Sequence, residues 1–128
     1  MIREIAKELL SYSRETLGPD LRAVTRYNRD EHEPIYTRED VPEQIELDED
    51  ARSMFRHPLV RMQSAAQELS QYHPYLDELD ASIYSYGTVT VVQFPITDED
   101  GIIVTLECEG DLSDGFVSRC KSIVSGAD

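Results

Sequence analysis

Two apolar segments in the second half of the chain constrain its fold more than any other feature. Residues 88–94 and 102–107 are rich in valine, isoleucine, leucine and phenylalanine, and an acidic loop at 97–101 separates them. Runs of β-branched and aromatic residues favour strands. The two segments therefore predict the centre of an antiparallel sheet. Residues 81–86, which end at Gly87, predict a third strand beside them.

The first part of the chain predicts one helix and a second hairpin. Apolar side chains recur at helical spacing from residue 2 to 16, and Gly18-Pro19 predicts the end of that helix. Residues 21–28 alternate between apolar and polar side chains, as in a half-buried strand. Residues 34–38 return as a partner strand. Pro34 suits a sheet edge because proline has no N–H to donate to a neighbouring strand.

Two more amphipathic helices are expected. One follows an irregular acidic connector at 39–50 and ends near His73-Pro74, and Pro58 predicts a kink or a restart within it. The other begins after a cap at Asp111 or Ser113. Each carries one apolar stripe, formed in the first by Ala51, Met54, Phe55, Leu59, Met62, Ala65, Ala66 and Leu69 and in the second by Leu112, Phe116, Val117, Cys120, Ile123 and Val124.

The predicted order of elements is α-β-β-α-β-β-β-α, in a single α+β domain that spans residues 1–128. A five-stranded antiparallel sheet with helices on one or both faces would cover every apolar stripe. This order resembles that of the Roadblock/LC7 and profilin-like folds. The resemblance implies a module that dimerises through a helix face or a sheet edge.

The charge of the chain predicts its solvent. Asp and Glu number 26 against 12 Lys and Arg, which gives a formal charge of −14, and only Lys7 and Lys121 are lysine. The Debye length falls from about 10 Å at 0.1 M salt to about 3 Å at 1 M, so concentrated salt screens this self-repulsion. We interpret the carboxylate surface as an adaptation to a halophilic cytoplasm. The alternative is an acidic mesophilic protein or an acidic interaction partner.

The same charge limits the partners of the chain. It repels nucleic-acid phosphates and anionic lipids, so we expect neither as a partner. We expect no secretory signal and no membrane-spanning segment, because residues 1–10 are charged and amphipathic and no run approaches about 18 apolar residues. Residues 35–41 and 89–104 also resemble segments of small acidic haloarchaeal proteins that form an uncharacterised family. That resemblance agrees with a cytoplasm rich in salt and implies no particular activity.

The chain shows no motif typical of catalysis or of cofactor binding. His32, His57 and His73 lack the spacing of metal ligands, and residues 98–101 lack the alternating oxygen ligands of a calcium loop. Cys108 and Cys120 are expected to be small buried hydrophobic residues, with a redox pair as the alternative. We therefore predict no catalytic residue, no metal and no cofactor. An enzymatic activity is the alternative hypothesis.

Two sets of residues are candidates for binding. Arg22 and Arg26 lie on one predicted strand, and Arg52 and Arg56 lie one turn apart on the second helix, so together they could line an anion pocket. Ordinary ion pairs with carboxylates are the alternative. Tyr84 and Tyr86 share one face of a strand and could mark a contact surface, or they could fill the core.

These observations predict a non-catalytic interaction or regulatory module. We expect it to be homodimeric or to bind a protein partner. The alternative is a sensor domain that binds a small anion or metabolite in a pocket lined by arginine side chains.

Overall fold

The computed structural model describes residues 2–40, 49–97, 99–108, 112 and 114–126, with the backbone alone at residues 2, 32, 49–57 and 114. The order of its elements is α-β-β-α-β-β-β-α, as predicted, with a short 3₁₀ turn at Gly18–Asp20. The elements are α1 (Ile2–Leu17), β1 (Leu21–Tyr27), β2 (His32–Thr37), α2 (Glu49–Tyr72), β3 (Ser82–Tyr86), β4 (Val89–Pro95), β5 (Gly101–Glu107) and α3 (Asp114–Ser125).

The five strands form one antiparallel sheet in the order β2-β1-β5-β4-β3. The strand β5 lies at its centre with β4 beside it, so the prediction that the two most apolar segments occupy the middle of the sheet is confirmed. The two edge strands are β2 and β3. The position of β2 also confirms that Pro34 belongs to an edge strand, where its missing N–H breaks no ladder.

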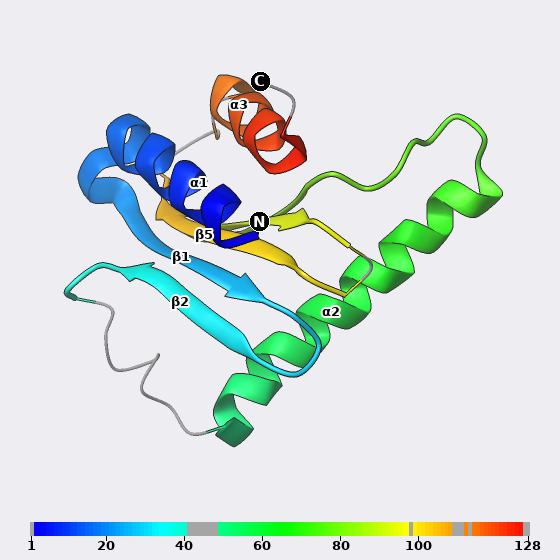
Figure 1. Cartoon of the computed structure of the whole chain (residues 1–128), viewed down its shortest axis with the longest axis horizontal. Coiled ribbons are helices and arrows are strands. Elements are labelled where there is room, and N and C mark those ends of the chain that lie inside the picture. The colour runs from blue at the N-terminus through cyan, green and yellow to red at the C-terminus, as the bar shows by residue number, and fades with distance from the viewer. Residues whose placement is uncertain (1, 41–48, 98, 109–111, 113, 127–128) are drawn as a thin grey trace.

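Helices cover both faces of the sheet. The helices α1 and α3 lie side by side on one face, whereas α2 crosses the other (Figure 1). Alternate residues of the central strands accordingly point into two different cores. In β5, for example, Val104 packs against α1 and α3, whereas Ile103 packs against α2. The central strands therefore read as nearly continuous apolar sequence, because both faces of the sheet are buried there.

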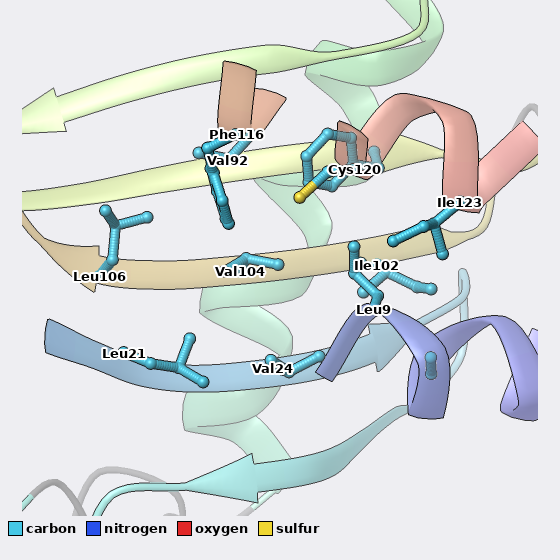
Figure 2. Packing of buried hydrophobic residues seen from close by; sticks show 12 residues of the cluster. Leu9, Leu21, Val24, Val92, Ile102, Val104, Leu106, Phe116, Cys120 and Ile123 are labelled. Carbon is cyan, nitrogen blue, oxygen red and sulfur yellow. The ribbon is translucent and has the colours of Figure 1, made fainter. Parts of the chain in front are cut away.

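The larger core lies between the sheet and the pair α1 and α3 (Figure 2). Val24, Val104 and Val92 lie opposite one another on three adjacent strands and are fully buried. Phe116 of α3 covers this part of the sheet and stacks on Tyr12 of α1, with ring centroids 5.8 Å apart. Burying an aliphatic or aromatic side chain of this size stabilises a fold by about 1.5 to 3 kcal/mol. This core therefore supplies much of the stability.

The first strand departs from the simple alternation that its sequence predicted. Its pairing shifts register with β5 between Leu21 and Ala23, and with β2 between Val24 and Thr25. As a result Leu21 and Val24, three residues apart, both reach the larger core, while Tyr27 reaches the α2 face. Irregularities of this kind re-aim side chains along a strand, so both faces of β1 are buried rather than one.

The second helix runs through Pro58 without interruption, so it does not restart there. No helix in the described parts of the chain is both long enough and apolar enough to cross a membrane. The predicted caps at Asp111 and Ser113, and residues 41–48 of the predicted connector, lie outside the described residues.

Candidate functional site

Between residues 58 and 72, α2 places few apolar side chains against the sheet. In the part of α2 whose side chains are described, Leu59 and Val60 pack against Tyr27, Val91 and Ile103. This cluster is smaller than the core on the opposite face. Beyond it, the carboxyl-terminal end of α2 extends past the ends of the strands before the chain returns to β3 (Figure 1).

An apolar stripe on α2 is therefore left uncovered. Met62, Leu69 and Tyr72 are 41%, 52% and 76% exposed, respectively. The sequence predicted a single stripe in which Leu59, Met62 and Leu69 share one buried face. The structure corrects this, because Leu59 is buried on the sheet whereas the other two face solvent. Their exposure on one helix makes this stripe a candidate interaction surface.

The edge strand β3 carries exposed side chains on both faces of the sheet. Ile83 lies opposite Val92 of the larger core and so is on the face of α1 and α3, whereas Tyr86 is on the face of α2. Ile83 and Tyr86 are 51% and 65% exposed, and no strand in the described parts of the chain pairs with the outer edge of β3. Tyr84 and Tyr86, the predicted contact pair, differ in their surroundings. The side chain of Tyr84 is half-buried and its hydroxyl donates a hydrogen bond to Oε1 of Gln93 at 2.9 Å, whereas Tyr86 extends into solvent.

The opposite edge of the sheet is protected against pairing. The edge strand β2 contains Pro34, and its Glu33 binds Arg3 at 3.3 Å and Arg26 at 3.6 Å. Proline and charged side chains are devices that keep an edge strand from adding a further strand. Strand β3 contains neither, since its sequence is Ser-Ile-Tyr-Ser-Tyr. Of the two edges, β3 is the one open to a partner. Hereafter "docking surface" denotes Met62, Leu69, Tyr72, Ile83 and Tyr86.

A buried polar network lies directly beneath α2. Gln63 of α2 and Gln93 of β4 are both fully buried. Nε2 of Gln93 donates to the hydroxyl of Tyr27 at 2.9 Å and to the carbonyl oxygen of Leu59 at 3.1 Å, and the Tyr27 hydroxyl in turn donates to Oε1 of Gln63. Burial raises the pKa of Tyr27 well above its ordinary value, so its hydroxyl keeps its proton.

Nε2 of Gln63 continues the network by donating to the carbonyl oxygen of Thr97 at 2.7 Å, in the turn between β4 and β5. This network was not predicted from the sequence. The sequence offered one clue. A glutamine lies among the apolar residues of the second helix, at Gln63, and another lies among those of the strand at 88–94, at Gln93. Buried amides must find partners, and their presence indicated a polar contact between α2 and the sheet.

Two of the predicted arginines, Arg22 and Arg26, bind carboxylates. A guanidinium nitrogen of Arg22 lies 3.1 Å from Glu107, and Arg38 lies 2.6 Å from the same carboxylate and 2.8 Å from Oδ2 of Asp40. Hydrogen bonds from Arg38 lower the pKa of both Glu107 and Asp40. Arg26 binds Glu33 instead, so Arg22 and Arg26 do not converge on one acceptor.

The side chains of Arg52 and Arg56 lie outside the described residues, and an anion pocket built from the four predicted arginines stays a prediction. A groove of about 560 Å³ beside α2 is lined by charges of both signs, including Arg29, Glu68 and Glu99. Arg29 lies 3.5 Å from Glu99 there. This mixture of positive and negative side chains does not favour the binding of an anion.

Neither cysteine forms a disulfide bond. Cys120 is buried in the larger core, and that burial raises the pKa of its thiol to about 12. Cys108 is half-buried and packs against the same core. Within the described residues, no group of three or more His, Cys, Asp or Glu side chains comes together in a way that could hold a metal ion.

Solved structures that share this fold include a Roadblock/LC7 domain and MglB proteins. A Roadblock/LC7 domain from Streptomyces avermitilis matches with a TM-score of 0.60 and 10% identity over 96% of this chain and 91% of its own. The gliding protein MglB from Thermus thermophilus gives 0.57, with 10% identity over 96% and 87%. An MglB structure with a tetrameric arrangement gives 0.56, with 16% identity over 96% and 85%.

These matches confirm the predicted Roadblock/LC7-like α+β fold. Among curated protein sequences, none matches this chain significantly. A family model described as a domain of unknown function (DUF7522) matches residues 7–125. The chain therefore belongs to the DUF7522 family.

Proposed function

We propose that this chain is a non-catalytic interaction module that associates with a second copy of itself through the docking surface. The observation that carries the proposal is the pairing of an open strand edge with an exposed apolar helix stripe. Ile83 and Tyr86 of β3 and Leu69 of α2 are each more than half exposed. One isolated chain leaves these side chains in water, and an isologous partner would bury them.

The nature of the β3 edge supports a second copy as the partner. An antiparallel strand added to β3 would extend the sheet, satisfy the outer backbone groups of the strand and place the two α2 helices on the same side. The sequence Ser82–Tyr86 holds no charge that would oppose its own copy. The tetrameric arrangement described for MglB is a precedent for self-association of this fold.

The charge around the docking surface supports a dependence of association on salt. Between residues 65 and 80 the acidic side chains are Glu68, Asp77, Glu78 and Asp80, and the segment contains no lysine or arginine. Two copies would bring like charges together, and screening at about 1 M salt would reduce their repulsion. We propose that the module works in the salt-rich cytoplasm of a halophile, where neither nucleic acid nor an anionic membrane is its partner.

Sedimentation equilibrium in about 2 M KCl tests self-association, because salt at that concentration screens the repulsion between the acidic side chains around the docking surface. We expect a mass of two chains for the wild type and of one chain for the double variant Leu69→Lys, Ile83→Lys. Both sites are exposed, so the variant should keep its melting temperature. Ser118→Lys, on the exposed surface of α3, is the control for the charge change and should remain a dimer. A one-chain mass for the wild type, or a dimeric double variant, would contradict the proposal.

Thermal unfolding of the double variant tests the salt proposal without interference from association. We expect its melting temperature to rise steeply as KCl increases from about 0.1 to about 2 M, because screening removes much of the self-repulsion of a chain with a formal charge of −14. An equal concentration of an uncharged osmolyte is the control for general solute effects. A melting temperature that is the same in dilute buffer and in KCl would contradict adaptation to salt.

A further inference from the structure

Two kinds of contact join the part of α2 whose side chains are described, residues 58–72, to the sheet: apolar packing and a buried hydrogen-bond network. Leu59 and Val60 are the α2 side chains that join the small core on this face, among those the structure describes. Hydrophobic contact is non-directional, so it buries a helix on a sheet without selecting one axial position or one rotation. Directional hydrogen bonds between α2 and the sheet add that selection.

The Gln63–Gln93 network supplies those bonds. Gln93 of β4 donates to the backbone carbonyl of Leu59 at 3.1 Å and to Oε1 of Gln63 at 3.2 Å. Gln63 donates to the carbonyl oxygens of Thr97 at 2.7 Å and of Asp100 at 3.3 Å. Hydrogen bonds hold only within a narrow range of length and angle, and Nε2 of Gln93 shares its two hydrogens among three acceptors, so together these bonds favour one axial position and one rotation of α2 on the sheet.

The network also reaches the docking surface. Tyr84 of β3 donates to Oε1 of Gln93, which connects the edge strand with the residue that holds α2. The hydroxyl of Tyr27 and the amides of Gln63 and Gln93 are all paired within the network. Replacing both partners of a buried hydrogen bond by apolar groups of the same shape can leave stability nearly unchanged, so a fully paired network contributes the arrangement of the groups that it joins more than net stability.

We infer that the buried Gln63–Gln93 network is a positioning device that sets where the α2 stripe lies relative to the β3 edge, and so makes the docking surface complementary to a second copy. This inference rests on the proposed self-association. Its residues touch no partner, because Gln63 and Gln93 are fully buried, and they act through the helix and strand that they join.

An apolar replacement of the whole network tests the inference. The triple variant Tyr27→Phe, Gln63→Leu, Gln93→Leu keeps the volume nearly constant and removes the three buried polar side chains together. The partners that it leaves, the Tyr84 hydroxyl and the carbonyl oxygens of Thr97 and Asp100, are only part-buried and can bond water, so we expect it to fold with a melting temperature close to that of the wild type. We expect its dimer to dissociate at a concentration at least about tenfold higher. Thr90→Val removes a buried hydroxyl from the same strand outside the network, and it should leave dimerisation unchanged.

Two readouts separate this inference from the proposed function. Nuclear Overhauser contacts between the methyl groups of Leu59 and Val91 report the position of α2 in a single chain. They should be single and strong in the wild type, and weakened or multiplied in the triple variant. A folded triple variant that dimerises as tightly as the wild type would overturn the inference.

Other outcomes are equally informative. If the triple variant does not fold, Tyr84→Phe removes only the bond from β3 to Gln93, and an unweakened dimer in that variant would overturn the inference. If the wild type is a monomer, the proposed function fails. The contacts of Leu59 then decide alone, and an identical pattern in the wild type and the triple variant would overturn the positioning role.

Discussion

Gly101 is the position at which one added methyl group should do the most damage. It opens β5 opposite Tyr27 of β1 and Pro95 of β4. A Cβ placed there would lie 2.5 Å from the backbone oxygen of Phe94 and 2.6 Å from the hydroxyl of Tyr27. The first neighbour is backbone in a central strand and the second belongs to the buried network, so neither can move freely. We therefore predict that Gly101→Ala forces Tyr27 out of its place.

The expected loss follows from two costs. Overpacking a well-filled core costs about 1 to 3 kcal/mol, and breaking the hydrogen bonds of Tyr27 adds about 1 kcal/mol. At about 2.1 cal/mol/K per residue, the unfolding entropy of a chain of this length makes a loss of about 2 to 4 kcal/mol lower the melting temperature by about 7 to 15 °C.

Differential scanning calorimetry of a double-mutant cycle checks the cause. Tyr27→Phe removes the oxygen that the new methyl group would strike, so its combination with Gly101→Ala should cost less than the sum of the two single losses. Gly87→Ala is the matched control, because Gly87 has a φ of 68° and no atom within 4 Å of its Cβ position. Its loss should reflect backbone strain alone and should be unaffected by Tyr27→Phe. A Gly101→Ala protein that melts within about 2 °C of the wild type, or strict additivity with Tyr27→Phe, would refute the reasoning.

Two further outcomes are expected. Arg38 lowers the pKa of Asp40 and of Glu107, so these carboxylates stabilise the fold above their unfolded pKa values, and that contribution is lost as the pH falls through the lowered ones. The stability difference between the wild type and Arg38→Met should therefore be largest near neutral pH and shrink in acid; a difference in urea midpoint that is constant with pH would contradict this. The thiol of Cys120, buried and with its pKa raised to about 12, should resist alkylation at neutral pH until the protein unfolds, whereas half-buried Cys108 should react first. Mass spectrometry of the alkylated protein measures the order, and simultaneous modification would contradict it.

The sequence predicted which residues of the candidate site are apolar or aromatic, but it did not predict which of them are exposed. Tyr84 and Tyr86 were predicted together from their shared strand face, and the structure gives the first a hydrogen bond within the fold and leaves the second exposed. The stripe on α2 was recognised as apolar, yet the sequence offered no reason to separate Leu59, which is buried, from Leu69, which is not. Burial depends on where the sheet ends beneath the helix, and a periodic pattern carries no such information.

The sequence by itself determined the order and type of the elements, because helical and strand periodicities of apolar residues are local properties of the chain. It also identified β2 as an edge strand, because Pro34 has no backbone N–H and so cannot donate a hydrogen bond to a neighbouring strand. Only the tertiary structure decided that both faces of the sheet are covered, that β3 is the open edge, and that Gln63 and Gln93 meet beneath α2. These features depend on contacts between residues far apart in the chain, whose partners are chosen by packing and hydrogen bonding of the whole fold.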